Sequence, residues 1–170
     1  MPKEKIVVLM GSKSDCEFAS RIGAFLEEAG FPVRCEYKIV SAHRTPRKLL
    51  DNLQEYEATE ENTVFITVAG LSDALSGVVA GYTKYPVIAC PPDSEKYEWA
   101  KTFSSAVTPK GIAVAYIPRP ENAALAAVKM LALSDHSLHD KIVRLRERMK
   151  RNVLKDAQEL EKSTRSKDKR

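Results

Sequence analysis

The sequence alternates short apolar runs with stretches of helical spacing, and this alternation restricts the fold more than any other feature. Nearly continuous Val and Ile in several runs is typical of strands buried on both faces of a parallel sheet. We therefore expect an α/β protein, a flavodoxin-like three-layer sandwich with a central parallel sheet. The expected strands are residues 5–10, 33–39, 63–68, 87–90 and 112–116, and the expected helices are residues 15–30, 46–58, 73–83, 97–106 and 120–133.

The pattern changes after Leu133. A narrow apolar stripe among many charges predicts an extra C-terminal amphipathic helix over about residues 137–162, whose apolar face needs either the body or a neighbouring subunit as a partner. We expect a domain over 1–134, this helix within 135–162, and a disordered tail over 163–170. The stripe consists of Leu138, Ile142, Leu145, Met149, Val153 and Leu160.

Charge and cysteine content exclude several classes of protein. Residues 135–170 hold 12 Lys/Arg and 7 Asp/Glu, which leaves 15 and 16 for the rest, so the basic character belongs to the C-terminal helix. This weakens a nucleic-acid role for the body. No apolar run is long enough for a membrane span or a secretory signal. The three scattered cysteines fit neither a disulfide framework nor a metal motif, so we expect a cytoplasmic protein.

Three loops rich in small and polar residues follow predicted strands, at residues 11–15, 41–45 and 69–73. Ligands of open parallel sheets bind beyond the carboxyl ends of the strands. We expect the three loops to meet at that edge, and this convergence is the main functional signal of the sequence.

The first loop suits a phosphate. Ser14 with Glu17 predicts a capping box that starts a helix at Asp15, and Ser12 and Ser14 add hydroxyl groups to the free N–H groups there. Gly11 would let the ligand approach the backbone. The alternative is a capped turn without a ligand. Neither a P-loop nor a dinucleotide fingerprint occurs in the chain.

The second loop, "SAHRTP", combines a titratable side chain with a fixed positive charge. Thr45 and Pro46 predict the cap and first turn of a helix. Arg44 could reach a phosphate on the first loop, and the His43 imidazole can accept and return a proton near neutral pH. A surface histidine in a turn is the alternative.

The third loop, "AGLSDALSG", can direct the N–H groups of Gly70 and Leu71 and the hydroxyl of Ser72 into the same space. Ser72 and Asp73 are equally compatible with a plain helix start. Asp93 and Ser94 of a fourth loop are weaker candidates. The pair His136 and His139 has the spacing of metal ligands but no supporting cluster, and Cys90 is more typical of a packed thiol than of a nucleophile.

Together, "GSKSD", "SAHRTP" and the following "AG" loop resemble the aminoimidazole ribonucleotide carboxylase and mutase family of purine biosynthesis, over about residues 6–134. The resemblance implies a flavodoxin-like subunit in a homo-oligomer, an octamer, with active sites at subunit contacts. It also implies no metal and no organic cofactor.

The family contains two reactions. The mutase moves a carboxylate from N5 of carboxyaminoimidazole ribonucleotide to C4, and its third loop is rich in Gly and Ala and carries a second histidine. The carboxylase adds CO2 to aminoimidazole ribonucleotide directly. The loop "AGLSDALSGVVAGYTKYPVIACPP" lacks that histidine and resembles the carboxylase, whereas the arginine of "SAHRTP" resembles the mutase. We give the third loop more weight, since it lies where the carboxylate would be handled.

The resemblance and the residue chemistry give the same roles. His43 is the expected catalytic residue, the acceptor of the C4 proton. The expected phosphate and ribose contacts are Gly11, Ser12, Ser14, Asp15, Ser41, Ala42 and Arg44. The expected CO2 or carboxylate loop is Gly70, Leu71, Ser72, Asp73 and Ala74, with a small dry pocket walled by Gly70, Leu71 and Ala74.

Two alternatives belong to other classes of function. One is a non-enzymatic module that binds a phosphate ligand, with the basic helix docking a partner. The other is RNA binding through residues 141–155, which the absence of interleaved aromatic residues disfavours.

Overall fold

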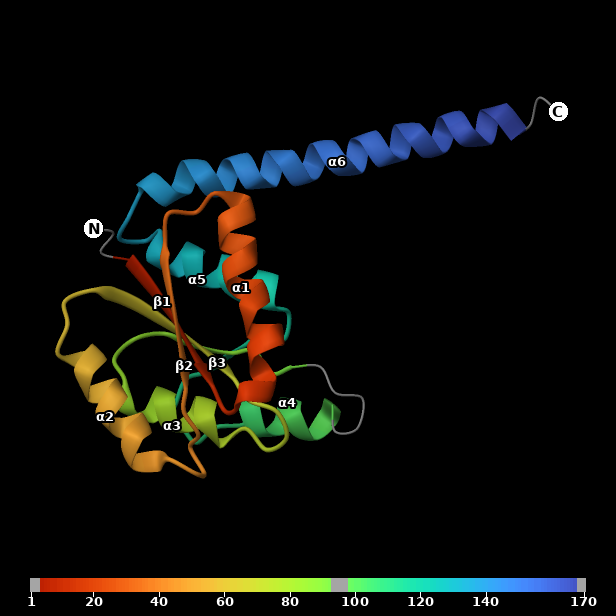
Figure 1. Ribbon diagram of the computed structural model, residues 1–170. Coiled ribbons are helices and arrows are strands. Elements are labelled where there is room, and N and C mark those ends of the chain that lie inside the picture. The colour runs from red at the N-terminus through yellow and green to blue at the C-terminus, as the bar shows by residue number, and fades with distance from the viewer. Residues whose placement is uncertain (1–3, 93–97, 168–170) are drawn as a thin grey trace.

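The computed structural model describes residues 4–92 and 98–167 and shows a parallel sheet between two layers of helices (Figure 1). Five strands pair in the order β2-β1-β3-β4-β5, all in parallel. The predicted flavodoxin-like class is therefore confirmed. The strands are β1 (Glu4–Met10), β2 (Arg34–Ile39), β3 (Asn62–Val68), β4 (Val87–Ala89) and β5 (Ala115–Tyr116).

Six α-helices and one 3₁₀ turn cover the sheet in the described residues. Helices α1 and α5 pack on one face together with the start of α6, and α2 and α3 pack on the other, with α4 beside α3 and β5 (Figure 1). The elements are η1 (Lys13–Asp15), α1 (Cys16–Ala29), α2 (Pro46–Glu57), α3 (Ala74–Tyr82), α4 (Glu98–Ala106), α5 (Pro120–Leu131) and α6 (Ser137–Lys167).

Alternation along the central strands divides the core in two. In β1, Ile6 and Val8 pack against α1 and α5, whereas Val7 and Leu9 pack against α2 and α3. All four side chains are fully buried, which explains the continuous apolar run in the sequence. Both cores pack the sheet tightly against its helices, so the loops at its carboxyl edge have a firm base.

Strand β5 is shorter than predicted. Strand β5 is limited to Ala115–Tyr116, because Gly111 has a φ of 96° and the Thr108 hydroxyl donates to the carbonyl of Ile112 at 2.6 Å. The turn holds Ile112 out of the ladder.

None of the described helices is both long and apolar enough to cross a membrane.

Helix α6 is longer than predicted. Residues 163–167, predicted as part of a disordered tail, continue the helix, and residues 168–170 lie outside the described residues. The segment contains no Gly or Pro to end a helix, and the hydroxyls of Ser163 and Thr164 donate to the carbonyl of Leu160 at 2.7 and 3.0 Å.

Candidate active site

Three loops meet at the carboxyl edge of the sheet, as predicted. The N–H of Gly11 donates to the carbonyl of Val68 at 2.9 Å, and the N–H of Val40 donates to the carbonyl of Met10 at 2.8 Å. These bonds join the ends of β1, β2 and β3. A cavity of about 560 Å³ lies between the loops that follow.

Twelve of the thirteen predicted site residues line this cavity. Asp73 is the exception. Ala69 and Leu75 line it as well; Ala69 belongs to the predicted third loop, but neither residue was among the predicted site residues. Ala69 directly follows β3 in the same loop, which is a signal the sequence offered, whereas Leu75 is an apolar residue of a helix and nothing in the pattern marks it. The lining from the predicted set is Gly11, Ser12, Ser14, Asp15, Ser41, Ala42, His43, Arg44, Gly70, Leu71, Ser72 and Ala74.

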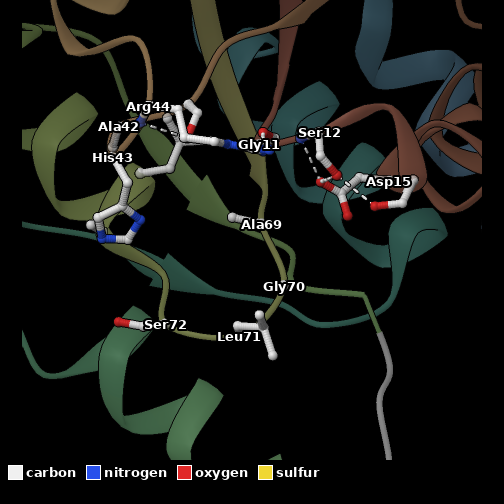
Figure 2. A pocket seen from close by; sticks show the side chains of 14 residues that line it. Gly11, Ser12, Asp15, Ala42, His43, Arg44, Ala69, Gly70, Leu71 and Ser72 are labelled. Atoms are coloured by element: carbon white, nitrogen blue, oxygen red, sulfur yellow. Dashed lines mark hydrogen bonds between the residues drawn. The ribbon is translucent and has the colours of Figure 1, made fainter.

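The first loop is closed by a different pair of residues than predicted. The buried carboxylate of Asp15 accepts from the N–H of Ser12 at 2.9 Å and from its hydroxyl at 3.2 Å (Figure 2). The Ser14 and Glu17 capping box is therefore wrong: the cap lies two residues earlier and starts η1, and α1 follows at Cys16. Asp15 braces the serine loop from within.

The two serine hydroxyls of this loop lie together at the cavity. Ser12 Oγ and Ser14 Oγ are 2.5 Å apart, and both residues line the space opposite the second loop. A phosphate placed here would meet two hydroxyls next to the N-terminal turn of η1 and α1, where backbone N–H groups add partial positive charge.

Arg44 connects the second loop to the first. Its Nη2 donates to the carbonyl of Gly11 at 2.6 Å, and its Nε approaches Ser41 Oγ at 3.5 Å (Figure 2). A guanidinium carries five N–H donors, and these contacts use two of them. Arg44 therefore brings positive charge to the serine loop, the place where the sequence predicted a phosphate.

Thr45 closes the second loop, and its side chain does not cap α2. Thr45 occupies the N-cap position of α2 and Pro46 the first turn, as predicted. The Thr45 hydroxyl, however, accepts from the N–H of Ser41 at 3.0 Å and donates to the carbonyl of Ser41 at 3.2 Å. The prediction that the Thr45 side chain caps α2 is wrong, because the hydroxyl instead fixes the turn that presents His43.

His43 projects from this turn into the cavity. Its side chain is exposed, and Figure 2 shows the imidazole pointing into the space that Leu71 and Ser72 border. An exposed ring on a fixed turn can meet a bound substrate without displacing any core group. The geometry therefore suits a proton acceptor for a ligand held by the first loop.

The third loop is held from inside the fold by Asp73. Its carboxylate accepts from the N–H of Ser76 at 3.0 Å, from the Ser76 hydroxyl, and from Ser105 Oγ of α4 at 2.8 Å. Ser76 Oγ lies 2.6 Å from Thr67 Oγ1 of β3. Asp73 was predicted within the carboxylate loop, but its carboxylate points away from the cavity and caps α3, the other reading of the sequence.

Leu71 is the exposed tip of this loop. Its φ of 59° lies in the left-handed region, the only such non-glycine residue in the described chain, and its side chain is 67% exposed. A leucine rarely adopts this conformation, so the surrounding structure must hold it there. Gly70, Leu71 and Ala74 all line the cavity as predicted, but this chain alone does not enclose them into a dry pocket.

No metal centre is formed by the residues that the structure describes, since no three His, Cys, Asp or Glu side chains come together. The rings of His136 and His139 lie 5.0 Å apart between centroids and stack edge to face. Asp93 and Ser94 lie outside the described residues.

Comparisons with known proteins show the family of this chain. The family profile described as AIR carboxylase matches residues 5–152. The chain is 44% identical over 156 residues to a phosphoribosylaminoimidazole carboxylase of Archaeoglobus fulgidus, covering 92% of this chain and 84% of that protein. It is 41% identical over 150 residues to an N5-carboxyaminoimidazole ribonucleotide mutase of Methanocaldococcus jannaschii, covering 87% and 92%. The crystal structure of Treponema denticola PurE superimposes with a TM-score of 0.87 at 36% identity, covering 92% of this chain and 98% of that chain.

Proposed function

Because this chain belongs to the AIR carboxylase family, an enzyme family of purine biosynthesis, we propose that it carboxylates 5-aminoimidazole ribonucleotide at C4. The product is 4-carboxy-5-aminoimidazole ribonucleotide. One observation carries this proposal: a single cavity of about 560 Å³ is shared by the serine loop, the His43 turn and the third loop.

The ribonucleotide's phosphate occupies the serine loop. Ser14 donates its hydroxyl, as does Ser12 once its hydroxyl turns away from Asp15, and Arg44 donates to the phosphate oxygens the N–H groups that are not bonded to the Gly11 carbonyl. Asp15 was expected to accept from the ribose hydroxyls. Its buried carboxylate already accepts from Ser12, so we assign it mainly to holding the loop.

The chemical step forms one carbon–carbon bond and breaks one carbon–hydrogen bond. C4 of the aminoimidazole is an enamine-like carbon and attacks CO2, so that the electron pair of a C=O bond moves onto oxygen and gives a carboxylate. The proton on C4 then passes to His43, and the electrons of the C–H bond restore the aromatic ring. In the reverse direction His43 returns the proton.

The third loop handles the carboxylate. Gly70, Leu71 and Ser72 line the cavity, and the N–H groups of the first two and the hydroxyl of the third would stabilise the negative charge as it develops. These donors are useful only while the loop keeps its shape, which Asp73 enforces from inside the fold.

The mutase is the second candidate. It is supported by Arg44, the mutase-like residue of "SAHRTP", and by the 41% identity to the mutase of M. jannaschii. The same cavity and the same proton acceptor would serve it. The difference lies in whether CO2 comes from solution or from N5 of the substrate.

Purified protein given either substrate separates the two reactions. With aminoimidazole ribonucleotide and bicarbonate, and with no ATP and no second enzyme, the carboxylase forms product at modest bicarbonate concentrations. Turnover only from the N5-carboxylated substrate would reject the carboxylase in favour of the mutase. Binding of the ribonucleotide without turnover of either substrate would support the non-enzymatic module.

We also propose that a neighbouring copy closes the site. Leu71 is an exposed apolar side chain at the cavity, and another subunit would cover it and keep water from the CO2 position. A homo-octamer, as the sequence resemblance implies, is the assembly we expect. Cys16, Cys35 and Cys90 form no disulfide, which suits a cytoplasmic location.

A further inference from the structure

Helix α6 continues well past the body of the protein. Leu138, Ile142 and Leu145 are buried against the core at 1%, 9% and 5% exposure, and Arg148 Nη1 reaches the carbonyl of Glu28 at 3.5 Å. Beyond this point the helix runs clear of the other elements (Figure 1). We refer to residues 149–167 as the overhang.

The apolar stripe that anchors α6 does not stop where the body ends. Met149, Val153 and Leu160 continue it at spacings of four and seven residues, on the same helix face as Leu145, and they are 55%, 67% and 69% exposed. In proteins, most of the stability of an amphipathic helix comes from packing its apolar face. The apolar face of the overhang therefore needs a packing partner, and the described residues of this chain do not provide one.

Charge along α6 is divided into consecutive blocks: a basic block, an acidic block, and a short basic end that holds Lys162, Arg165 and Lys167. Residues 141–155 hold seven Lys/Arg and one acidic residue, Glu147, whereas residues 156–161 hold Asp156, Glu159 and Glu161 and no Lys or Arg. Two parallel copies would place like charge against like charge. Two antiparallel copies can place the acidic block of each against the basic block of the other.

We propose that the overhang pairs antiparallel with the overhang of a second copy of this chain. The apolar stripe fixes the alignment: with Met149 opposite Leu160 of the second copy, Val153 lies opposite Asp156. Residues 156–161 then face residues 148–153, which contain Arg148, Lys150 and Arg151. A polar residue within the seam, here Asp156, specifies register at some cost in stability.

The pairing goes beyond the proposed enzymatic function and does not depend on it. Residues 153–167 also lie past the part of the chain that the family profile matches. An anionic polymer or a membrane surface is a poorer partner for the overhang, since the acidic block would repel it. In a helix bound to RNA, the apolar stripe would also stay exposed to water.

Cysteine cross-linking of the full chain tests the alignment. In a Met149→Cys/Leu160→Cys double variant, the two positions lie about 16 Å apart along one helix, at about 1.5 Å per residue, too far for a bond within the chain. We expect mild oxidation to give a covalent dimer for the double variant only. A covalent dimer from Met149→Cys alone indicates a parallel pair and overturns the proposal, as does no dimer from any variant.

Charge exchange tests the same pairing without cysteines. We expect Glu159→Lys/Glu161→Lys to lower the mass measured by light scattering at low salt, and Lys150→Glu/Arg151→Glu to do the same. The fourfold variant that combines them should restore the wild-type mass, because its blocks are again complementary in the antiparallel arrangement. An unchanged mass in both double variants contradicts the proposal and would point to the body of a neighbouring copy as the occupant.

Discussion

Arg44 is the residue that joins the His43 turn to the serine loop. Its bond to the Gly11 carbonyl spans 2.6 Å between residues 33 positions apart in the sequence. A guanidinium can hold this carbonyl and two phosphate oxygens in one plane, which an ammonium group cannot do. Recognition of the substrate phosphate is therefore expected to depend on arginine and not merely on positive charge.

Arg44→Lys should raise KM for the ribonucleotide about tenfold or more, with a smaller change in kcat, because it loses one charge-assisted hydrogen bond in binding. The measurement is steady-state kinetics with the ribonucleotide varied. Arg47→Lys is the matched control, since Arg47 is exposed on the first turn of α2 and does not line the cavity. Equal KM values for the two variants would remove Arg44 from the phosphate site.

Asp73 supports the site without contacting it. Asp73→Asn replaces a buried acceptor of three hydrogen bonds by an amide, and we expect a loss of about 1–3 kcal/mol in the free energy of unfolding. Chemical denaturation measures this loss. Asp51→Asn, at an exposed position of α2, serves as the control and should change stability little. A similar result for both variants would show that the network does not hold the third loop.

At the scale of elements, the sequence predicted what depends on local pattern. The strands β1, β3 and β4 and helices α2 and α5 start or end within two residues of their predicted limits, because burial on both sheet faces and capping Pro residues leave clear periodic signals. Strand β5 was overestimated, since the turn at Gly111 depends on backbone conformation and not on hydrophobicity.

Glu61 joins β1 and β2 at the amino ends of the strands, opposite the carboxyl edge of the sheet. Its carboxylate accepts from Lys5 Nζ of β1 at 2.5 Å and from Arg34 Nη2 of β2 at 2.9 Å. The hydrogen bond from Lys5, together with the charges of Lys5 and Arg34, lowers the pKa of Glu61 below its ordinary value of 4.5. Glu61 is therefore ionised in the folded state at pH values where it is partly protonated in the unfolded chain.

This lowered pKa predicts a dependence of stability on pH. A carboxyl whose pKa is lower in the folded state stabilises the fold above its unfolded pKa, and the contribution disappears as pH falls through the folded pKa. Glu61→Gln should therefore destabilise the protein at pH 7 and lose less stability than the wild type below about pH 4.5. Urea denaturation across this pH range measures it. Glu60→Gln, at the exposed neighbouring position, should keep the wild-type profile.

At the scale of the whole molecule, the sequence predicted that the three loops meet, but not the hydrogen bonds that hold each loop in shape. The carboxyl edge of a parallel sheet brings loops together whatever their details, so the strand pattern predicted where the three loops meet, and the chemistry and family resemblance of their motifs predicted twelve of the lining residues. The third loop is closed by a tertiary contact between Asp73 and Ser105, whereas the first two loops are closed by local pairs, Asp15 with Ser12 and Thr45 with Ser41. No local signal distinguishes these pairs from other Ser, Thr and Asp residues that could cap a helix.

The central claim is that the proton on C4 of the substrate leaves to His43. Aminoimidazole ribonucleotide tritiated at C4, given with bicarbonate, should release tritium to water as the wild type turns over. In His43→Asn, the rate of release, corrected for background, should fall by about 10²–10⁴-fold while ribonucleotide binding persists. His136→Asn is the control and should leave the rate unchanged, since His136 does not line the cavity. Release of tritium by His43→Asn at the wild-type rate would contradict the account.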